Sequence, residues 1–203
     1  MGRTTKVKKL ALNFESKTDA ATADIHNCIE AVCTACEQLS QTATGALIVF
    51  ERETKLGEQI DTGTIINATP SPELFGNIFF PNTPLHDGAV IIRDSKVYAA
   101  GCFLPKPQKE ELISKALGSR HRAAIGMSEV SDAVIVVVSE ETGTISIAEN
   151  GSLTRFYNKD TLRKLLTAKL IPEKPEAKKM KGKALKKHKK NAPDAKKEQG
   201  ADK

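Results

Sequence analysis

The sequence predicts a mixed α/β fold, in which a single domain carries a central mixed β-sheet flanked by helices. Short runs of branched apolar residues alternate with amphipathic helical segments along residues 16–171, as they do in α/β domains. Several runs are separated by only four polar residues, too few for a crossover helix, so part of the sheet must be antiparallel. The 203 residues, 39% of them hydrophobic, suit one such domain.

A helix over residues 16–41 is predicted first, because apolar side chains recur there at steps of three and four. They are Ile25, Ile29, Val32, Cys36 and Leu39. The branched run over residues 45–51 predicts a buried strand, and a second short strand is expected over residues 63–68. Ser71 as cap and Pro72 as first helical residue predict a helix that extends to residue 79.

Proline and glycine exclude regular structure from residues 82–88, which therefore form a loop. A hairpin follows, with strands over residues 89–92 and 97–103. Residues 109–117 are expected to be helical, and Ser119 is predicted to cap a further helix that runs towards residue 128.

The last part of the domain is predicted to hold a strand pair over residues 133–139 and 144–148, followed by a helix over residues 159–170. Beyond residue 171 the hydrophobic periodicity disappears and Lys, Ala, Pro and Glu dominate. That composition predicts a disordered tail over residues 172–203. The chain then divides into a basic N-terminal segment (1–15), the domain (16–171) and a Lys-rich tail (172–203).

The net charge of +6 lies at the two ends of the chain. Residues 1–10 carry four basic and no acidic side chains, and residues 173–203 carry 12 Lys against five acidic residues. Residues 11–172 are left with a net charge of −5. Basic ends of this kind are usually solvated tails, and contact with nucleic acid or an anionic lipid surface is the sharper alternative.

The cellular compartment of the protein is indicated by its apolar runs, its N-terminus and its cysteines. The longest aliphatic run, residues 133–138, is far below the roughly 18 residues that span a bilayer, so no integral membrane segment is expected in this chain. The basic start is followed by too short an apolar run for a signal peptide. Three of the four cysteines fall in a helical pattern, which favours core packing over metal or redox chemistry. A cytoplasmic protein is therefore predicted.

Two polar clusters beside predicted strands are candidates for chemistry. His86, Asp87 and Gly88 lie where a loop meets a strand, which presents the carboxylate at the edge of a rigid element. That placement suits a metal ligand or a group that activates a hydroxyl, although an isolated Asp-Gly is more often a simple turn. Familiar phosphate-binding patterns such as GxxxxGK[ST] and GxGxxG do not occur.

The second cluster is the run GSRHR over residues 118–122. Two forked guanidiniums, a hydroxyl and the N–H groups of a helix start would together bind a polyanion, and the alternative is a solvated helix face. A third group, Ser139, Glu140 and Glu141, follows the most apolar strand. The simplest interpretation is a surface turn, and the functional alternative is a site that binds a metal or a ribose.

Together these clusters resemble the signature motifs of the diadenylate cyclases, which join two ATP molecules into cyclic di-AMP. The resemblance rests on Asp87-Gly88-Ala89, on Arg120-His121-Arg122, and on the longer stretches FPNTPLHDGAVI and GSRHRAAIGMSEVSDAVIVVVSEETG. It covers about residues 22–166 and is closest to the cytosolic catalytic domain of the membrane-tethered type. Either this chain is such a domain without its membrane helices, or it is a soluble member whose basic ends replace the anchor at the membrane surface.

The resemblance implies a role for each cluster. Asp87, Arg120 and Arg122 would be catalytic, with Asp87 assisting the attacking 3′-hydroxyl. His86, Asp87 and Glu141 would lie near a divalent metal, Mg²⁺ or Mn²⁺. The residues implied in ATP binding are Leu47, Gly88, Phe103, Leu104, Pro105, Ser119, Arg120, His121, Arg122, Ser139 and Glu140. Phe103 and Ser119 depart from the family's usual tyrosine and threonine.

The reaction also implies a partner. Cyclic di-AMP has two phosphodiester links, and the domain has one copy of each cluster, so two domains must face each other in a homodimer or a higher oligomer. The sequence leaves two other functions open. One is a nucleotide-sensing module that has lost catalysis, and the other is a nucleic-acid-binding protein that acts through its basic tail.

Overall fold

The computed structural model describes residues 3–108, 110–114 and 117–171, with the backbone alone for residues 3–18 and 112. The predicted tail over residues 172–203 lies outside the described residues. Within those ranges, none of the helices is long and apolar enough to cross a membrane.

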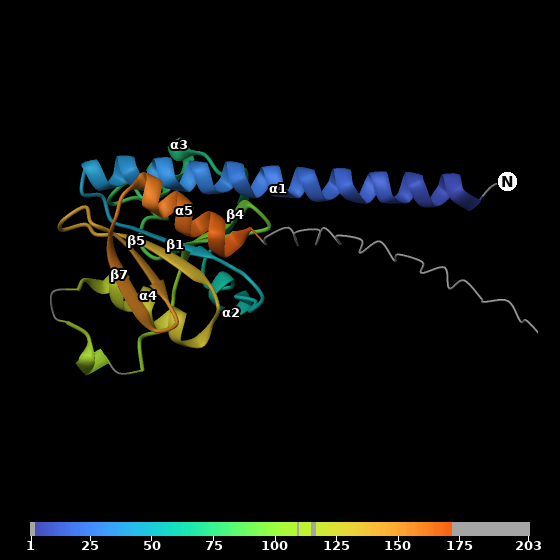
Figure 1. The fold of residues 1–203 in the computed structure, drawn as a ribbon. Coiled ribbons are helices and arrows are strands. Elements are labelled where there is room, and N and C mark those ends of the chain that lie inside the picture. The colour runs from blue at the N-terminus through green and yellow to red at the C-terminus, as the bar shows by residue number, and fades with distance from the viewer. Residues whose placement is uncertain (1–2, 109, 115–116, 172–203) are drawn as a thin grey trace, which may run out of the picture. The chain divides into compact units, whose positions relative to one another are not determined.

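The described residues form one seven-stranded mixed sheet, in the order β2-β4-β3-β1-β5-β6-β7 (Figure 1). Strand β1 is parallel to β3, and every other neighbouring pair is antiparallel. The predicted mixed sheet is therefore confirmed. The strands are β1 (Ala46–Phe50), β2 (Thr64–Ala68), β3 (Ala89–Arg93), β4 (Lys96–Cys102), β5 (Val134–Val138), β6 (Ile145–Glu149) and β7 (Ser152–Tyr157).

Helices cover both faces of the sheet and bury two hydrophobic cores (Figure 1). On one face, α1, α3 and α5 pack against Ile48 and Phe50 of β1, and on the other, α2 and α4 pack against Leu47 and Val49. The central strand is buried on both faces, which is why its residues are all apolar. The helices are α1 (Arg3–Gln41), α2 (Gly57–Ile60), α3 (Pro72–Ile78), α4 (Ser119–Val130), α5 (Lys159–Leu170) and the 3₁₀ helix η1 (Glu110–Leu112).

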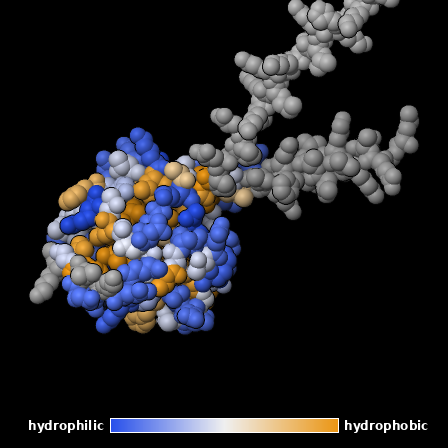
Figure 2. All heavy atoms as spheres, turned by 60° about the horizontal axis from the view of Figure 1, so that its bottom comes forward, coloured by the Kyte–Doolittle hydropathy of each residue, from blue (hydrophilic) through white to orange (hydrophobic). Residues whose placement is uncertain are grey.

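The face that carries α4 shows apolar residues in separate patches among polar and charged ones (Figure 2). The four cysteines are buried and free, as predicted for core residues. Burial raises the pKa of Cys28 and of Cys33 to about 12, so neither is a thiolate at neutral pH. The predicted α3 cap is confirmed, because the Ser71 hydroxyl accepts the N–H of Leu74 at 3.2 Å.

Three expectations about local structure were wrong, and one strand was missed. Helix α1 begins at Arg3 rather than residue 16, since no proline or glycine interrupts residues 3–41, so no break in the backbone separates the N-terminal segment. The helix expected over residues 109–117 is reduced to η1, with residues 109 and 115–116 outside the described ones. Gly118 rather than Ser119 is the N-cap of α4, without a side-chain bond. Strand β7 was not predicted, although the Asn150-Gly151 turn before it is a strong hairpin signal.

Candidate active site

Strand directions bring the predicted clusters to one edge of the sheet. Because β1 and β3 are parallel, their first residues, Ala46 and Ala89, lie at the same edge. The antiparallel strands β5 and β4 end at that edge, with Val138 paired to Ala46 and Cys102 paired to Ala89. The Asp87 loop, the Ser139 turn and the segment after β4 therefore meet there. We call this the site edge.

A cavity of about 130 Å³ at the site edge joins the two principal motifs. Its lining residues are Leu47, Asp87, Gly88, Cys102, Phe103, Leu104, Ser119, Arg120 and Ala123. Seven of the residues named from the sequence are thus brought together, from β1, the Asp87 loop, the end of β4 and the first turn of α4. Next to it a hollow of about 10 Å³ is shared by residues 118–121 and 138–141, which include His121, Ser139, Glu140 and Glu141. Pro105, His86 and Arg122 line neither space.

Arg120 is held in place by two partners. Its Nη1 forms an ion pair with Glu140, and its Nη2 donates to the backbone oxygen of His86 at 3.2 Å. Its buried Nε has no hydrogen-bond partner among the described residues. Gly45 gives the guanidinium room, because a Cβ there would lie 2.7 Å from Arg120 Nη1 and 2.9 Å from Glu140 Cβ. Sequence reasoning missed Gly45, since nothing local shows that an arginine 75 positions later would pack on it.

Asp87 stands at the cavity with its carboxylate uncommitted. The side chain is exposed and makes no hydrogen bond or ion pair with the described residues. The next residue, Gly88, has a φ of +111°, and a Cβ there would lie 2.7 Å from the backbone carbon of Gly101. Only glycine fits this position. The glycine of the Asp-Gly pair therefore lets the Asp87 loop pack closely on the backbone of β4.

His121 is a buried neutral imidazole beneath the first turn of α4. It is 4% exposed, and its Nε2 has no hydrogen-bond partner among the described residues. Burial lowers the pKa of His121, and the charge of Arg155 lowers it further, while Glu141 and Glu140 raise it in part. An unpaired ring nitrogen in a buried place is costly unless a ligand or water completes it. His121 therefore suits a role in binding.

Ser139 and Arg122 have structural partners in this arrangement. The Ser139 hydroxyl accepts the N–H groups of Glu141 and Thr142, both at 3.3 Å, which is the bonding of a simple turn. Arg122 Nη1 pairs with Glu110 at 3.2 Å, and its Nε donates to the Leu117 oxygen. Arg122 and Arg120 thus have different partners and do not converge on one point. The roles predicted for Ser139 and Arg122 stay predictions.

The expected metal ligands form only part of a site. Among the described residues, no group of three or more His, Cys, Asp or Glu side chains is placed to hold a metal ion. His86 Nδ1 donates to the Thr83 oxygen at 2.6 Å, which leaves Nε2 for other use. The free carboxylate of Asp87 suits a hard divalent cation, whose other ligands are commonly substrate phosphates and water. The assignment of His86, Asp87 and Glu141 to a metal stays a prediction.

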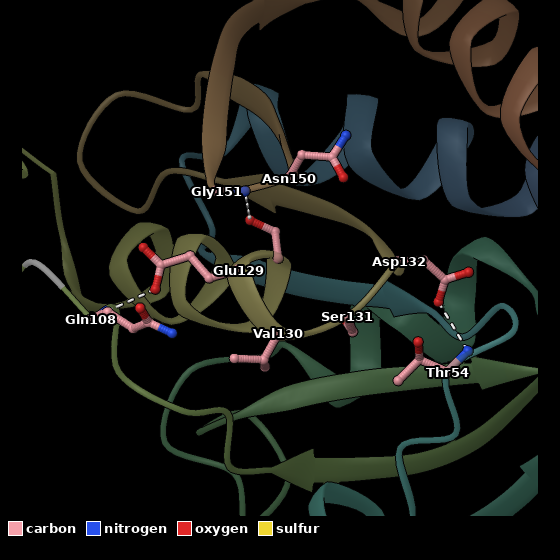
Figure 3. Close-up of a pocket in the computed structure, with 9 residues that line it drawn as sticks. Thr54, Gln108, Glu129, Val130, Ser131, Asp132, Asn150 and Gly151 are labelled. Carbon is pink, nitrogen blue, oxygen red and sulfur yellow. Dashed lines mark hydrogen bonds between the residues drawn. The ribbon is translucent and has the colours of Figure 1, made fainter.

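The largest cavity described lies elsewhere, at the C-terminal end of α4 (Figure 3). It measures about 740 Å³, but both of its carboxylates and the Ser128 hydroxyl are engaged in the fold. Glu129 accepts the N–H of Gln108 at 2.7 Å, and Asp132 accepts that of Thr54 at 2.9 Å (Figure 3). The Ser128 hydroxyl accepts the N–H of Gly151 at 3.0 Å. Volume alone therefore does not locate the functional site.

A mixed sheet with glycine, a helix start and charged side chains gathered at one edge is typical of α/β nucleotide-binding domains. A family model described as "DisA bacterial checkpoint controller nucleotide-binding" matches residues 33–153, more than half of the chain. The chain belongs to this family.

Relatives and solved structures agree with this membership. The chain is 49% identical over 140 residues to "Cyclic di-AMP synthase CdaA" of Bacillus subtilis, which covers 69% of this chain and 51% of that protein. It is 44% identical over 146 residues to "Diadenylate cyclase" of Listeria monocytogenes, which covers 72% and 53%. The crystal structure of a DacA double mutant from Staphylococcus aureus matches with a TM-score of 0.69 and 46% identity, over 71% of this chain and 96% of that one. The chain spans about half the length of the first two relatives.

Proposed function

We propose that this chain carries the catalytic domain of a diadenylate cyclase, which condenses two ATP molecules into cyclic di-AMP and releases two pyrophosphates. The observation that carries the proposal is the cavity that joins the free carboxylate of Asp87 to Ser119 and Arg120 at the start of α4. Its support from relatives is the identity of 49% to a protein named cyclic di-AMP synthase.

The cavity offers an apolar part and a polar part, as a nucleotide requires. Leu47, Phe103 and Leu104 provide apolar surface for adenine, with Pro105 beside them in the chain. Phe103 is 63% exposed, so its ring is open to stacking. Gly88, Ser119, Arg120, His121 and Arg122, with Ser139 and Glu140, are proposed to bind ribose and phosphates. The first turn of α4 adds backbone N–H groups that favour anions.

Catalysis needs placement and charge compensation more than covalent work by the protein. Asp87 orients the 3′-hydroxyl of one ATP towards the α-phosphorus of the other and accepts its proton. The new bond joins that oxygen to the α-phosphorus, and the bond from the α-phosphorus to the bridging oxygen breaks as pyrophosphate leaves. A divalent cation bound near His86, Asp87 and Glu141, Mg²⁺ or Mn²⁺, would offset the phosphate charge and favour ionisation of the hydroxyl.

The active species is proposed to be a homodimer with two site edges facing each other. One cavity of this kind lies within the described residues, whereas each attack joins two nucleotides. If the dimer is weak, specific activity will rise with enzyme concentration until the dimer is saturated. Specific activity should be measured over a hundredfold range of enzyme concentration, with the oligomeric state followed by light scattering. Constant specific activity of an enzyme that stays monomeric would contradict the dimer.

The direct test of the activity is chromatographic analysis of products from the purified chain with ATP and either Mg²⁺ or Mn²⁺. Cyclic di-AMP and pyrophosphate in a ratio of one to two are expected. Binding of ATP without any product would instead favour the nucleotide-sensing module. The same assay compares the two metals.

The domain bounds and the role of the tail are also proposals. Among the side chains of α1 that the structure describes, Ile25 is the first that packs on the core, which supports a catalytic domain that starts within α1. We propose that residues 172–203 are dispensable for catalysis and bind nucleic acid or anionic lipid through their lysines. Deletion of these residues should leave product formation unchanged and reduce salt-sensitive retention on DNA or anionic liposomes. Loss of turnover on deletion, or unchanged retention, would contradict this division.

A further inference from the structure

Strand register places one more arginine on the face of the sheet that carries the candidate site. Leu47 of β1 pairs with Val137, Val137 pairs with Ser146, and Ser146 pairs with Arg155 of β7. Residues paired in a row across a sheet point to the same face. Leu47 lines the cavity, so Arg155 lies on the same face, three strands away or roughly 14 Å at the usual spacing.

The packing around β7 supports this placement. Leu153, two residues before Arg155, packs against the core beneath α4. The positive charge of Arg155 also lies near enough to His121 to contribute to the lowered pKa of that buried imidazole, after burial itself. Arg155 therefore lies within electrostatic range of the first turn of α4.

Arg155 differs from the other two arginines in its charge balance. Arg120 is paired with Glu140, and Arg122 is paired with Glu110. The exposed guanidinium of Arg155 forms no ion pair with the described residues, and instead lies over the Phe156 ring, 5.2 Å from its centroid. Of the three, Arg155 offers the charge that is not already offset by a carboxylate.

The backbone at Phe156 is shaped to present this pair at the surface. Phe156 has a φ of +70°, a strained value for an aromatic residue, and it lies at a register shift between β6 and β7. Its ring is 80% exposed, so it adds little to the core. Bulges of this kind often re-aim side chains next to functional sites.

The order of strands then matches the order of groups along a nucleotide. Adenine-binding surface is proposed at the ends of β4 and β1, and Asp87 and Arg120 lie beside β3, β1 and β5. An extended triphosphate that starts there and runs along the site edge approaches β6 and β7. We propose that Arg155 binds the β- and γ-phosphates of the bound nucleotide, with Phe156 holding its guanidinium. This inference rests on the proposed function and adds a phosphate-binding residue to it.

The test compares two ligands that differ in their distal phosphates. The α,β-methylene analogue of ATP keeps three phosphates but cannot be cleaved between the α- and β-phosphorus, and AMP has only the first phosphate. Calorimetric titration with Mg²⁺ should show that Arg155→Ala weakens binding of the analogue about tenfold and leaves AMP binding unchanged. Arg155→Lys should retain part of the affinity, because the charge remains but the fork is lost.

Arg52→Ala is the matched control. Arg52 is also exposed, and its Nη1 donates to the Asp132 oxygen at the opposite edge of the sheet. The control should bind both ligands like the wild type. Unchanged affinity for the analogue in Arg155→Ala, an equal loss for AMP, or an equal loss in the control would each overturn the proposal. If Arg155→Ala does not fold, Arg155→Lys is tested in its place. A loss of affinity for the analogue but not for AMP would then support the proposal, and equal changes for both would overturn it.

Failure of this inference can be distinguished from failure of the proposed function. Product analysis of the wild type tests the cyclase activity, whereas the titration needs no turnover. If cyclic di-AMP forms but Arg155→Ala does not selectively lose affinity for the triphosphate analogue, the role of Arg155 alone is overturned. A ligand contrast without product would support Arg155 as a phosphate-binding residue and overturn the cyclase. A wild type that binds neither ligand would overturn both.

Discussion

The two edges of the sheet use similar charged side chains in opposite ways. At the far edge, where β1 ends, the side chain of Glu51 is 1% exposed. It accepts hydrogen bonds from Nε and Nη2 of Arg93 at 2.8 and 2.6 Å and from the N–H of Leu56 at 2.9 Å. Asp132 accepts the N–H groups of Glu53 and Thr54 at 3.1 and 2.9 Å. Both carboxylates are therefore fully engaged in the fold.

Polar groups at the site edge are left partly unsatisfied. Asp87 has no hydrogen-bond or ion-pair partner among the described residues, and the buried Nε of Arg120 and Nε2 of His121 lack hydrogen-bond partners there. Such groups lower stability unless something else completes them. Unsatisfied polar groups gather at the site edge, whereas the carboxylates at the far edge are satisfied. This difference indicates that the site edge binds a ligand. Hydrogen-bond satisfaction locates the site better than cavity size does, since the larger cavity lies near the far edge.

The largest expected effect comes from replacing a carboxylate by its isosteric amide at the site edge. Asp87→Asn should reduce cyclic di-AMP synthesis about 100-fold or more, because a carboxamide cannot accept the proton of the attacking hydroxyl. ATP binding should change little, because the carboxylate acts on the attacking hydroxyl rather than on the adenine or most of the triphosphate. The free energy of unfolding should also change little, since Asp87 has no hydrogen-bond or ion-pair partner among the described residues. Product chromatography and urea unfolding measure the two quantities. Near wild-type turnover would exclude Asp87 from catalysis.

At the far edge the corresponding change should affect stability instead. Glu51→Gln leaves the Arg93 guanidinium beside a neutral amide, and should lower the free energy of unfolding by about 2 kcal/mol. Activity per folded molecule should be unchanged. Urea unfolding compares this variant directly with Asp87→Asn. If both variants lost activity without losing stability, the contrast between the edges would be wrong.

The space at Gly45 provides a third comparison. Gly45→Ala places a Cβ 2.7 Å from Arg120 Nη1, so the guanidinium must move and ATP affinity should fall about tenfold. Gly57→Ala is the control, since a Cβ there meets nothing within 4 Å. Calorimetric titration with ATP measures both. Equal affinity in the two variants would show that the position of Arg120 does not matter for binding.

The smallest effect is a difference in pH dependence. Since the pKa of His121 is lowered in the fold from an ordinary 6.5, the unfolded chain takes up a proton that the folded chain resists as pH falls through 6.5. Its stabilising contribution is thus complete above pH 6.5 and declines below it. His121→Gln should flatten that part of the stability profile, measured by urea unfolding from pH 7 to 5. A profile of unchanged slope would mean that His121 titrates alike in both states.

Acid should act on the far edge in a different pH range. Burial tends to raise the pKa of Glu51, but hydrogen bonds from Arg93 and Leu56 outweigh it, and the net pKa lies below the ordinary 4.5. The stability that this carboxylate contributes is therefore present above pH 4.5 and lost as pH falls further. Glu51→Gln should remove that loss without altering the slope between pH 7 and 5, which separates the two edges in a single experiment.

The sequence by itself determined much of the fold, because local patterns carry strong signals. The apolar run of β5, the capped start of α3 and the glycine-flanked loop before β3 each depend on neighbours within a few residues. The motifs at Asp87 and Arg120 could also be identified from residue type and order. The exposed strand β7 was missed because its own residues lack a buried apolar pattern, although the Asn150-Gly151 turn before it was a usable signal. The start of α1 was misplaced because nothing local marks it.

Only the tertiary structure decided which of the motif residues act together. Register across β1, β5, β6 and β7 aligns Leu47 with Arg155 although 108 positions separate them in the chain. Packing at Gly45 directs Arg120 towards Glu140, and Arg122, two residues on, turns to Glu110 instead. Neither arrangement is encoded in a local pattern, because distance across a sheet follows strand order and direction, and side-chain partners follow the space that distant residues leave.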